Sequence, residues 1–176
     1  MSTGNKINII YRACEELVTP TMKSAVRPPW FNKKRCFKSL VDSVRRSNVD
    51  VDFYCVFDGE ERELSEYIKN FTEVQYQPIK VFANLKSLVY CLNFSQELKV
   101  SSVYFVEDDY LHVPTAMNIL SDGITRFGLV TGYDHTDRYT LEGLASDITK
   151  DRESLKLGKL CHWRTSESTT GTWAAD

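Results

Sequence analysis

Three consecutive carboxylates, Glu107-Asp108-Asp109, directly follow the apolar segment 102–106. Adjacent carboxylates repel one another at neutral pH, and a bound divalent cation would relieve that repulsion. Mg²⁺ and Mn²⁺ prefer oxygen ligands and keep coordination positions open for substrate phosphates. The alternative is that these acids are solvated, or favour the N-terminus of a helix after Pro114. Because the apolar segment reads as a strand covered on both faces, we expect its end to lie in a cleft and to bind metal.

The elements that position the acidic triplet follow from the hydrophobic pattern. Short apolar runs predict strands, and apolar side chains three and four residues apart predict helices. Strands are expected at 7–11, 51–57, 74–81, 102–106 and 127–131, of which 74–81 is an edge strand or bent because it contains Pro78. Helices are expected at 33–47, 60–70 and 115–121, and one more begins at an Asn84 cap and turns Leu85, Leu88, Val89 and Leu92 to one face. Residues 133–165 give a weak signal, which favours loops and a short helix.

This alternation of strands and helices is typical of an α/β fold with a mainly parallel central sheet and helices on both faces. The length of 176 residues suits a single domain. Ligands of such sheets bind beyond the carboxyl ends of the strands. The residues that follow the expected strands therefore meet at one edge: Arg12, Asp58, the acidic triplet and Asp134.

A hydrophobic strand that ends in Glu-Asp-Asp resembles the metal-binding "DXD" region of GT-A glycosyltransferases. Further segments are similar to those families: Tyr11-Arg12 at the end of the first strand, Arg27-Pro28-Pro29-Trp30-Phe31 with Ser39-Leu40 after it, Asp58-Gly59, and Asn84-Leu85. The resemblance covers roughly residues 6 to 134. It implies a single GT-A-like domain over residues 1–176, in which 1–134 bind the nucleotide sugar and 135–176 form a short acceptor and C-terminal part.

The resemblance also implies roles for individual residues. Asp109 would ligate the metal, a divalent Mn²⁺ or Mg²⁺, and the late histidine His162 would be an additional ligand, although an ordinary half-buried histidine is an equal alternative. Donor contacts would come from the remaining matching positions: Arg12, Arg27, Asp58, Asn84, Glu107 and Asp108. Trp173 and Trp163 could stack on a sugar ring or pack in the core.

An inverting transfer needs a general base that takes the proton of the acceptor hydroxyl. Asp134 follows the last expected strand and so should face the cleft. Asp176 follows Thr172-Trp173, a segment after which some of the families place their base, and Asp137 is a further carboxylate in the region. A retaining mechanism would need no such base, so both stereochemical outcomes stay open.

The sequence therefore predicts a metal-dependent glycosyltransferase that uses a nucleotide-diphosphate sugar, in particular a UDP-sugar. The acceptor could be a glycan, a small molecule or modified DNA. A non-catalytic nucleotide- or carbohydrate-binding module is the alternative from another class. A sugar-phosphate nucleotidyltransferase is less favoured, because it would need a glycine-rich loop after the first strand, where this chain has Tyr11-Arg12-Ala13-Cys14-Glu15-Glu16.

The overall composition narrows the choice of function. A formal net charge of −2 argues against a general nucleic-acid binder, and the basic stretch at residues 33–46 is expected to be mostly a solvated helix face. The five cysteines form no CxxC pair and are expected to be inert, reduced thiols. The polar residues 1–6 do not read as a signal peptide, and no apolar run approaches the roughly 20 residues of a membrane helix. We therefore expect a cytoplasmic protein without a membrane span.

Overall fold

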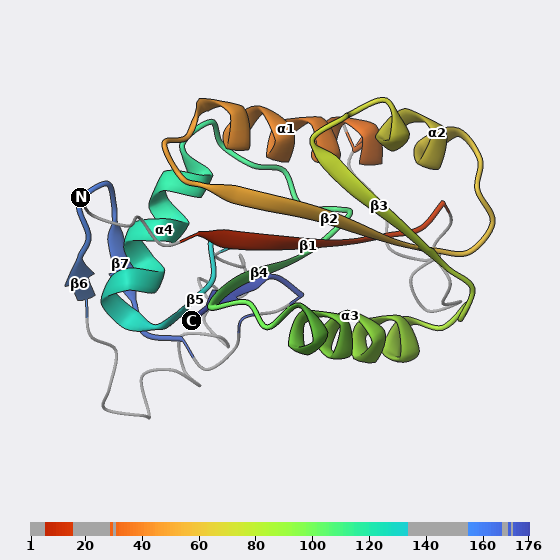
Figure 1. Ribbon diagram of the computed structural model, residues 1–176. Helices are drawn as coiled ribbons and strands as arrows, with labels where there is room; N and C mark the ends of the chain where they lie inside the picture. Colours follow the sequence, from red (N-terminus) through yellow and green to blue (C-terminus); the bar gives the residue numbers. More distant parts are fainter. Residues whose placement is uncertain (1–5, 16–28, 30, 134–154, 167–168, 170) are drawn as a thin grey trace.

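The computed structural model describes residues 6–15, 29, 31–133, 155–166, 169 and 171–176. These residues form an α/β structure with a six-stranded, mostly parallel sheet, four helices and a separate two-stranded hairpin (Figure 1). The expected fold class, with helices on both faces of the sheet, is thus confirmed. None of the described helices is long and apolar enough to cross a membrane.

The central sheet has the strand order β3-β2-β1-β4-β8-β5. Its strands are β1 (Ile7–Ala13), β2 (Val51–Asp58), β3 (Val74–Ile79), β4 (Ser102–Glu107), β5 (Leu129–Val130) and β8 (Trp173–Ala175). Strands β1 to β4 pair in parallel, whereas β8 runs antiparallel between β4 and β5. The edge position expected for the strand with Pro78 is confirmed, since β3 ends the sheet.

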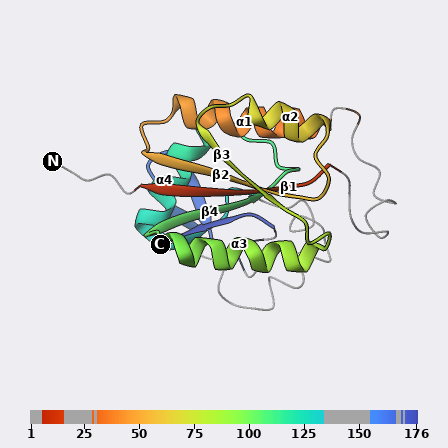
Figure 2. The ribbon, with the colours of Figure 1, turned by 45° about the vertical axis from the view of Figure 1, so that its right-hand side comes forward.

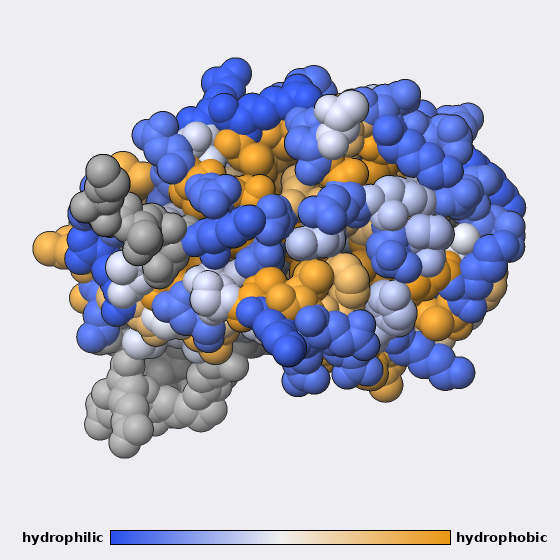
Figure 3. All heavy atoms as spheres, viewed as in Figure 1, coloured by the Kyte–Doolittle hydropathy of each residue, from blue (hydrophilic) through white to orange (hydrophobic). Residues whose placement is uncertain are grey.

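Helices cover both faces of this sheet (Figures 1 and 2). On one face α1 (Lys33–Arg46), α2 (Glu63–Lys69) and α4 (Ala116–Phe127) enclose the larger hydrophobic core, and on the other α3 (Asn84–Leu98) encloses a smaller one. β1 contributes to both cores, because Ile9 points to the first and Ile10 to the second and both are fully buried. In the space-filling view the outer surface over α1 and α2 is largely hydrophilic, as amphipathic helices require (Figure 3).

The helix α1 follows directly from its sequence. The side chain of Asn32 caps it by accepting a hydrogen bond from the backbone N–H of Arg35 at 3.1 Å. Phe37, Leu40 and Val41 are buried on one side of the helix, and Arg45 and Arg46 lie in its last turn, where positive charge is favourable. The expected range 33–47 is therefore correct to within one residue.

The helix α3 corrects two expectations. Its cap residue is Ala83, and the Asn84 side chain accepts a hydrogen bond from Arg12 instead of capping the helix. Ser87 and Cys91 form its buried face, so that Leu85 and Val89 are 71% and 46% exposed. The prediction of an inward-facing Leu85 and Val89 is wrong because the contact with Arg12 and the short side chains of Ser87 and Cys91 set the rotation of the helix against the sheet.

The chain after β4 also differs from expectation. α4 continues to Phe127, well beyond the expected end at 121, and the strand after it shortens to Leu129–Val130. Gly123 lies inside this helix, and the ring of Trp163 packs against it. A Cβ at position 123 would lie 2.6 Å from that ring. Trp163 belongs to a hairpin of β6 (Leu155–Leu157) and β7 (His162–Arg164), where loops and a helix were expected.

The strand β8 is the largest addition to the sequence interpretation. The tail 166–176 gave no strand signal, yet Trp173–Ala175 inserts beside the central strand β4 and is itself paired on both sides. The C-terminal segment is thereby part of the same sheet as the nucleotide-sugar-binding part expected at 1–134. From β1 the chain continues to β2 and β3 on one side of the sheet, and from β4 it continues toward β5 on the other side. The strand order therefore reverses between β1 and β4, and this is the topological switch point of the sheet.

Candidate functional site at the switch point

Arg12 and Glu107 meet at the carboxyl ends of β1 and β4, where these strands pair with each other. The guanidinium of Arg12 forms an ion pair with the Glu107 carboxylate, and it also donates hydrogen bonds to the backbone and side-chain oxygens of Asn84 at the start of α3. Three positions predicted for donor binding are thus brought together. In these contacts Arg12 is 72 residues away in sequence from Asn84 and 95 residues away from Glu107.

A small pocket of about 70 Å³ opens beside this ion pair, between β4 and α3. Arg12, Glu107 and Trp173 line it together with Gly171. A Cβ at position 171 would collide with the Glu107 carboxylate where Arg12 holds it, so a side chain there would displace that carboxylate. The structure therefore brings Trp173 to the predicted site. The centroids of the Trp173 and Phe105 rings lie 4.5 Å apart.

Asp108 is buried on the other side of β4 and has fixed partners. Its Oδ2 accepts hydrogen bonds from the Lys33 Nζ at 2.7 Å and from the Cys14 backbone N–H at 2.9 Å. Burial raises the pKa of Asp108, and the positive charge of Lys33 opposes that shift. Burial by itself would lower the pKa of Lys33, but the charges and hydrogen bonds of Asp108 and Cys14 together raise it. The Asp108 carboxylate thus ties β4 to α1 and to the end of β1.

The acidic triplet is partly neutralised by the protein itself. Glu107 is paired with Arg12 and Asp108 with Lys33, so the expected mutual repulsion of three carboxylates is already relieved at two of them. Burial raises the pKa of Glu107, and the charge of half-buried Asp109 raises it further against the opposing effect of Arg12. Among the described residues no group of three or more histidines, cysteines and acids could hold a metal ion by itself.

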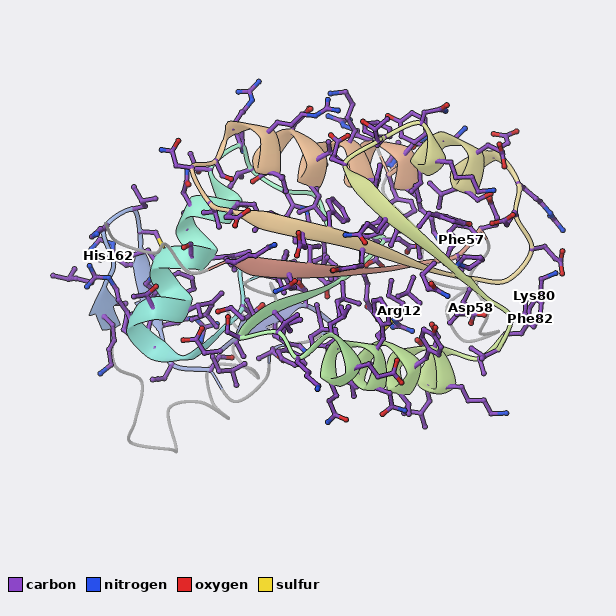
Figure 4. All side chains as sticks on the ribbon, in the orientation of Figure 1. Arg12, Phe57, Asp58, Lys80, Phe82 and His162 are labelled. Carbon is purple, nitrogen blue, oxygen red and sulfur yellow. The ribbon has the colours of Figure 1, made fainter. Side chains whose placement is uncertain are left out.

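Asp58 and Phe82 form a second part of the same edge. Buried Asp58 ends β2, and its Oδ1 accepts hydrogen bonds from the backbone N–H groups of Val81 and Phe82 at 2.9 and 3.0 Å. These bonds hold Phe82 at a φ of 50°, which a side chain of this size rarely adopts, and leave its ring 51% exposed next to Gly59. Figure 4 shows Arg12, Asp58 and Phe82 at the same end of the molecule.

Two predicted site residues lie elsewhere. His162 begins β7 on the outlying hairpin, at the far end of the molecule from Arg12 and Asp58 (Figure 4). Asp176 accepts a hydrogen bond of 2.6 Å from Ser102, which starts β4, whereas the acidic triplet follows the opposite end of that strand. The structure therefore contradicts the placement of His162 beside Asp109 and of Asp176 as a base at this edge. β8 runs antiparallel to β4 and so carries Asp176 away from the site.

Other predicted residues cannot be placed. Arg27 and the carboxylates Asp134 and Asp137 lie outside the described residues. None of the five cysteines forms a disulfide; Cys36, Cys55 and Cys91 are buried, and Cys14 and Cys161 are partly exposed.

Sequence reasoning missed three residues of the site. Lys33 was assigned to a solvated helix face, but it is the first residue of α1 and points back to β1 and β4. Phe82 gave no signal, because its exposure depends on the turn that Asp58 fixes. The close contact of Gly171 with Glu107 joins residues far apart in sequence. The sequence hinted only at Lys33, because a side chain in the first turn of a helix can reach the ends of neighbouring strands.

No protein-family model matches this chain, and a search of curated proteins finds no significant match. Function must therefore be inferred from the site, because an α/β fold alone supports many unrelated activities.

Proposed function

We propose that this chain is a metal-dependent glycosyltransferase of the GT-A type, which transfers a sugar from a nucleotide-diphosphate sugar, with UDP-sugars as the favoured donors, to an acceptor hydroxyl. The observation that most supports it is the position of Glu107-Asp108-Asp109 at the switch point of the sheet, beside Arg12 and a pocket. Open α/β sheets bind ligands at this point.

A divalent cation fits the residues at this position. Mg²⁺ and Mn²⁺ in nucleotide enzymes need only one or two carboxylates, because phosphate oxygens and waters complete their coordination. Asp109 and the neighbouring Glu107, whose carboxylate is paired with Arg12, would supply these ligands, whereas the Asp108 carboxylate is buried against Lys33 and Cys14. When bound, the cation would neutralise negative charge on the departing diphosphate. Arg12 holds the Glu107 carboxylate in place and adds positive charge at the same edge.

Phe82 and Asp58 support a nucleoside-binding site next to the position proposed for the cation and the diphosphate. An exposed aromatic ring offers a flat face on which a nucleobase can stack. Non-glycine residues held in the left-handed region cluster at functional sites, because the surrounding structure must stabilise their strain. The two hydrogen bonds that Asp58 accepts from the backbone of Val81 and Phe82 supply that stabilisation. Asp58 would therefore shape the site as well as make the donor contact predicted from the sequence.

The alternative, a non-catalytic nucleotide- or carbohydrate-binding module, is favoured by one observation. Two of the three carboxylates at the site are held in ion pairs, and Asp176, one of the predicted bases, lies at the opposite edge of the sheet. The two functions differ in whether a bound nucleotide sugar is turned over.

Binding of the donor can be tested by titration calorimetry of UDP with and without Mn²⁺. We expect Mn²⁺ to strengthen UDP binding, and Asp109→Asn to remove that gain by weakening affinity about tenfold or more. Glu97→Gln, an exposed acid on α3, is the control and should bind as the wild type does. Equal UDP affinity in Asp109→Asn and Glu97→Gln, with a melting temperature that confirms folding, would remove the basis of the metal assignment.

A further inference from the structure

A second cavity, of about 120 Å³, lies on the other face of β4, next to the start of α4. We call it the tyrosine cavity, and it is lined chiefly by Tyr104, Tyr110, Leu111, His112, Tyr133 and Thr172. A site for one water needs about 10–15 Å³ on this measure, so the cavity admits several waters or one small ring. It is much smaller than the 300–1,000 Å³ of a typical drug-sized site.

The polar groups inside the tyrosine cavity include two hydroxyls and an imidazole, which are hydrogen-bonded to one another. Tyr104 Oη lies 2.9 Å from His112 Nε2, and the Thr172 hydroxyl lies 3.1 Å from Tyr104 Oη. Burial lowers the pKa of His112 to about 4, so its ring is neutral at pH 7. None of the described lining residues is charged at that pH. The cavity is therefore suited to a neutral ligand with hydroxyl groups.

The mouth of the tyrosine cavity is apolar and aromatic. Tyr110 and Tyr133 meet edge to face with ring centroids 5.0 Å apart, and Leu111, Val113 and Tyr133 are exposed around them. Flat aromatic faces beside hydroxyls match a sugar ring, which has C–H groups on its faces and hydroxyls at its edge. A polyanion such as DNA would instead require basic groups at the mouth, and the described lining residues contain none.

Residues 171 and 172 separate this cavity from the pocket beside Glu107. Gly171 lines the Glu107 pocket and its backbone N–H donates to Tyr110 Oη at 3.3 Å, while the next residue, Thr172, lines the tyrosine cavity. The backbone of these two residues therefore lies between a ligand in one compartment and a ligand in the other. Because a group transfer needs the reacting atoms in direct contact, the tyrosine cavity is a binding site separate from the Glu107 pocket.

We infer that the tyrosine cavity is a second binding site and takes a neutral saccharide, with a pyranose ring packed against Tyr133 and Tyr110. This binding goes beyond the proposed function and does not depend on it.

The test uses the whole chain and four probes: the methyl glycosides of β-glucose, β-galactose, α-mannose and N-acetyl-β-glucosamine. Their dissociation constants are measured by NMR titration for the wild type, Tyr133→Ala, Ala116→Leu and Leu157→Ala. Tyr133→Ala removes a stacking face, and Ala116→Leu fills the cavity from the start of α4. Leu157→Ala removes an exposed apolar side chain on the hairpin and is the control.

We expect at least one glycoside to bind, Tyr133→Ala and Ala116→Leu to raise its dissociation constant about three- to tenfold, and Leu157→Ala to leave it unchanged. Binding of none of the four glycosides, or equal affinity in all variants, would overturn the inference. So would competition for the cavity by a single-stranded oligodeoxynucleotide that binds more tightly than every glycoside. Failure of the proposed function would differ: the glycosides would bind in the cavity while UDP with Mn²⁺ did not bind at all.

Discussion

Lys33 and Arg12 determine how the acidic triplet can act. Each cation reaches across the sheet edge to one carboxylate, and the sequence separations of 75 and 95 residues explain why no local pattern indicated the pairs. Three adjacent acids are visible in a sequence, but the cations that neutralise them are visible only in the fold. The triplet therefore combines a stabilising role, at Asp108, with the functional role that we propose for Asp109 and Glu107.

Lys33→Ala should lower the free energy of unfolding by about 3 kcal/mol at pH 7, because it leaves the buried Asp108 carboxylate without its charged partner. Urea unfolding measures the change. Lys34→Ala, which breaks the exposed pair with Glu63, is the control and should cost less than about 0.5 kcal/mol. The loss should shrink as the pH falls, because burial raises the pKa of Asp108 and the carboxylate then takes up a proton. A loss no larger than that of the control would mean that the Lys33–Asp108 pair does not stabilise the fold.

His112 should make the stability depend on pH. Burial lowers its pKa in the folded chain to about 4, below the ordinary value of 6.5, so the unfolded chain binds a proton more readily between these pH values. The stabilising contribution is complete above pH 6.5 and is lost as the pH falls to about 4, a change of ~3 kcal/mol.

The pKa of His112 can be measured by NMR, and the stability effect by comparing urea unfolding of the wild type and His112→Gln from pH 4 to 7. The difference between the two curves isolates His112 from the carboxylates, and His162→Gln on the exposed hairpin is the control. An NMR pKa near 6.5 would show that the ring is hydrated.

At the scale of elements, strands and helices with a clear apolar pattern were predictable. The positions of β1, β2, β4 and α1 follow from their own residues, because each buries a continuous apolar run or one helical face. The strand β8 was not predictable, since the three residues Trp173–Ala175 gain strand geometry only by pairing with β4 and β5. The rotation of α3 likewise depends on tertiary contacts and not on its own pattern.

The observed rotation of α3 leads to a comparison of two leucines on one helix. Leu85→Ala should change the free energy of unfolding by less than about 0.5 kcal/mol, because its side chain is 71% exposed. Leu92→Ala should cost about 1–2 kcal/mol, because Leu92 packs against the smaller core. Chemical denaturation of the two variants measures both values. Equal losses would support the rotation predicted from the sequence pattern instead.

At the scale of the whole molecule, the order of the strands gives the site its place. The rule that ligands bind at the carboxyl ends of parallel strands correctly brought Arg12, Asp58 and the acidic triplet to one edge from the sequence alone. It could not extend to the chain after β4, where β8 reverses direction and carries Asp176 to the opposite edge. The pocket beside Glu107 and the tyrosine cavity lie on the two faces of β4, separated by residues 171 and 172.

The most direct test of the proposed activity is Mn²⁺-dependent release of UDP from UDP-sugars, measured with the whole chain in the presence of the methyl glycosides. We expect release from at least one UDP-sugar that requires Mn²⁺ and falls about a hundredfold in Asp109→Asn, while Glu97→Gln retains it. No Mn²⁺-dependent release from any UDP-sugar, or equal release by Asp109→Asn and Glu97→Gln, would contradict the assignment of this edge of the sheet as a glycosyltransferase site.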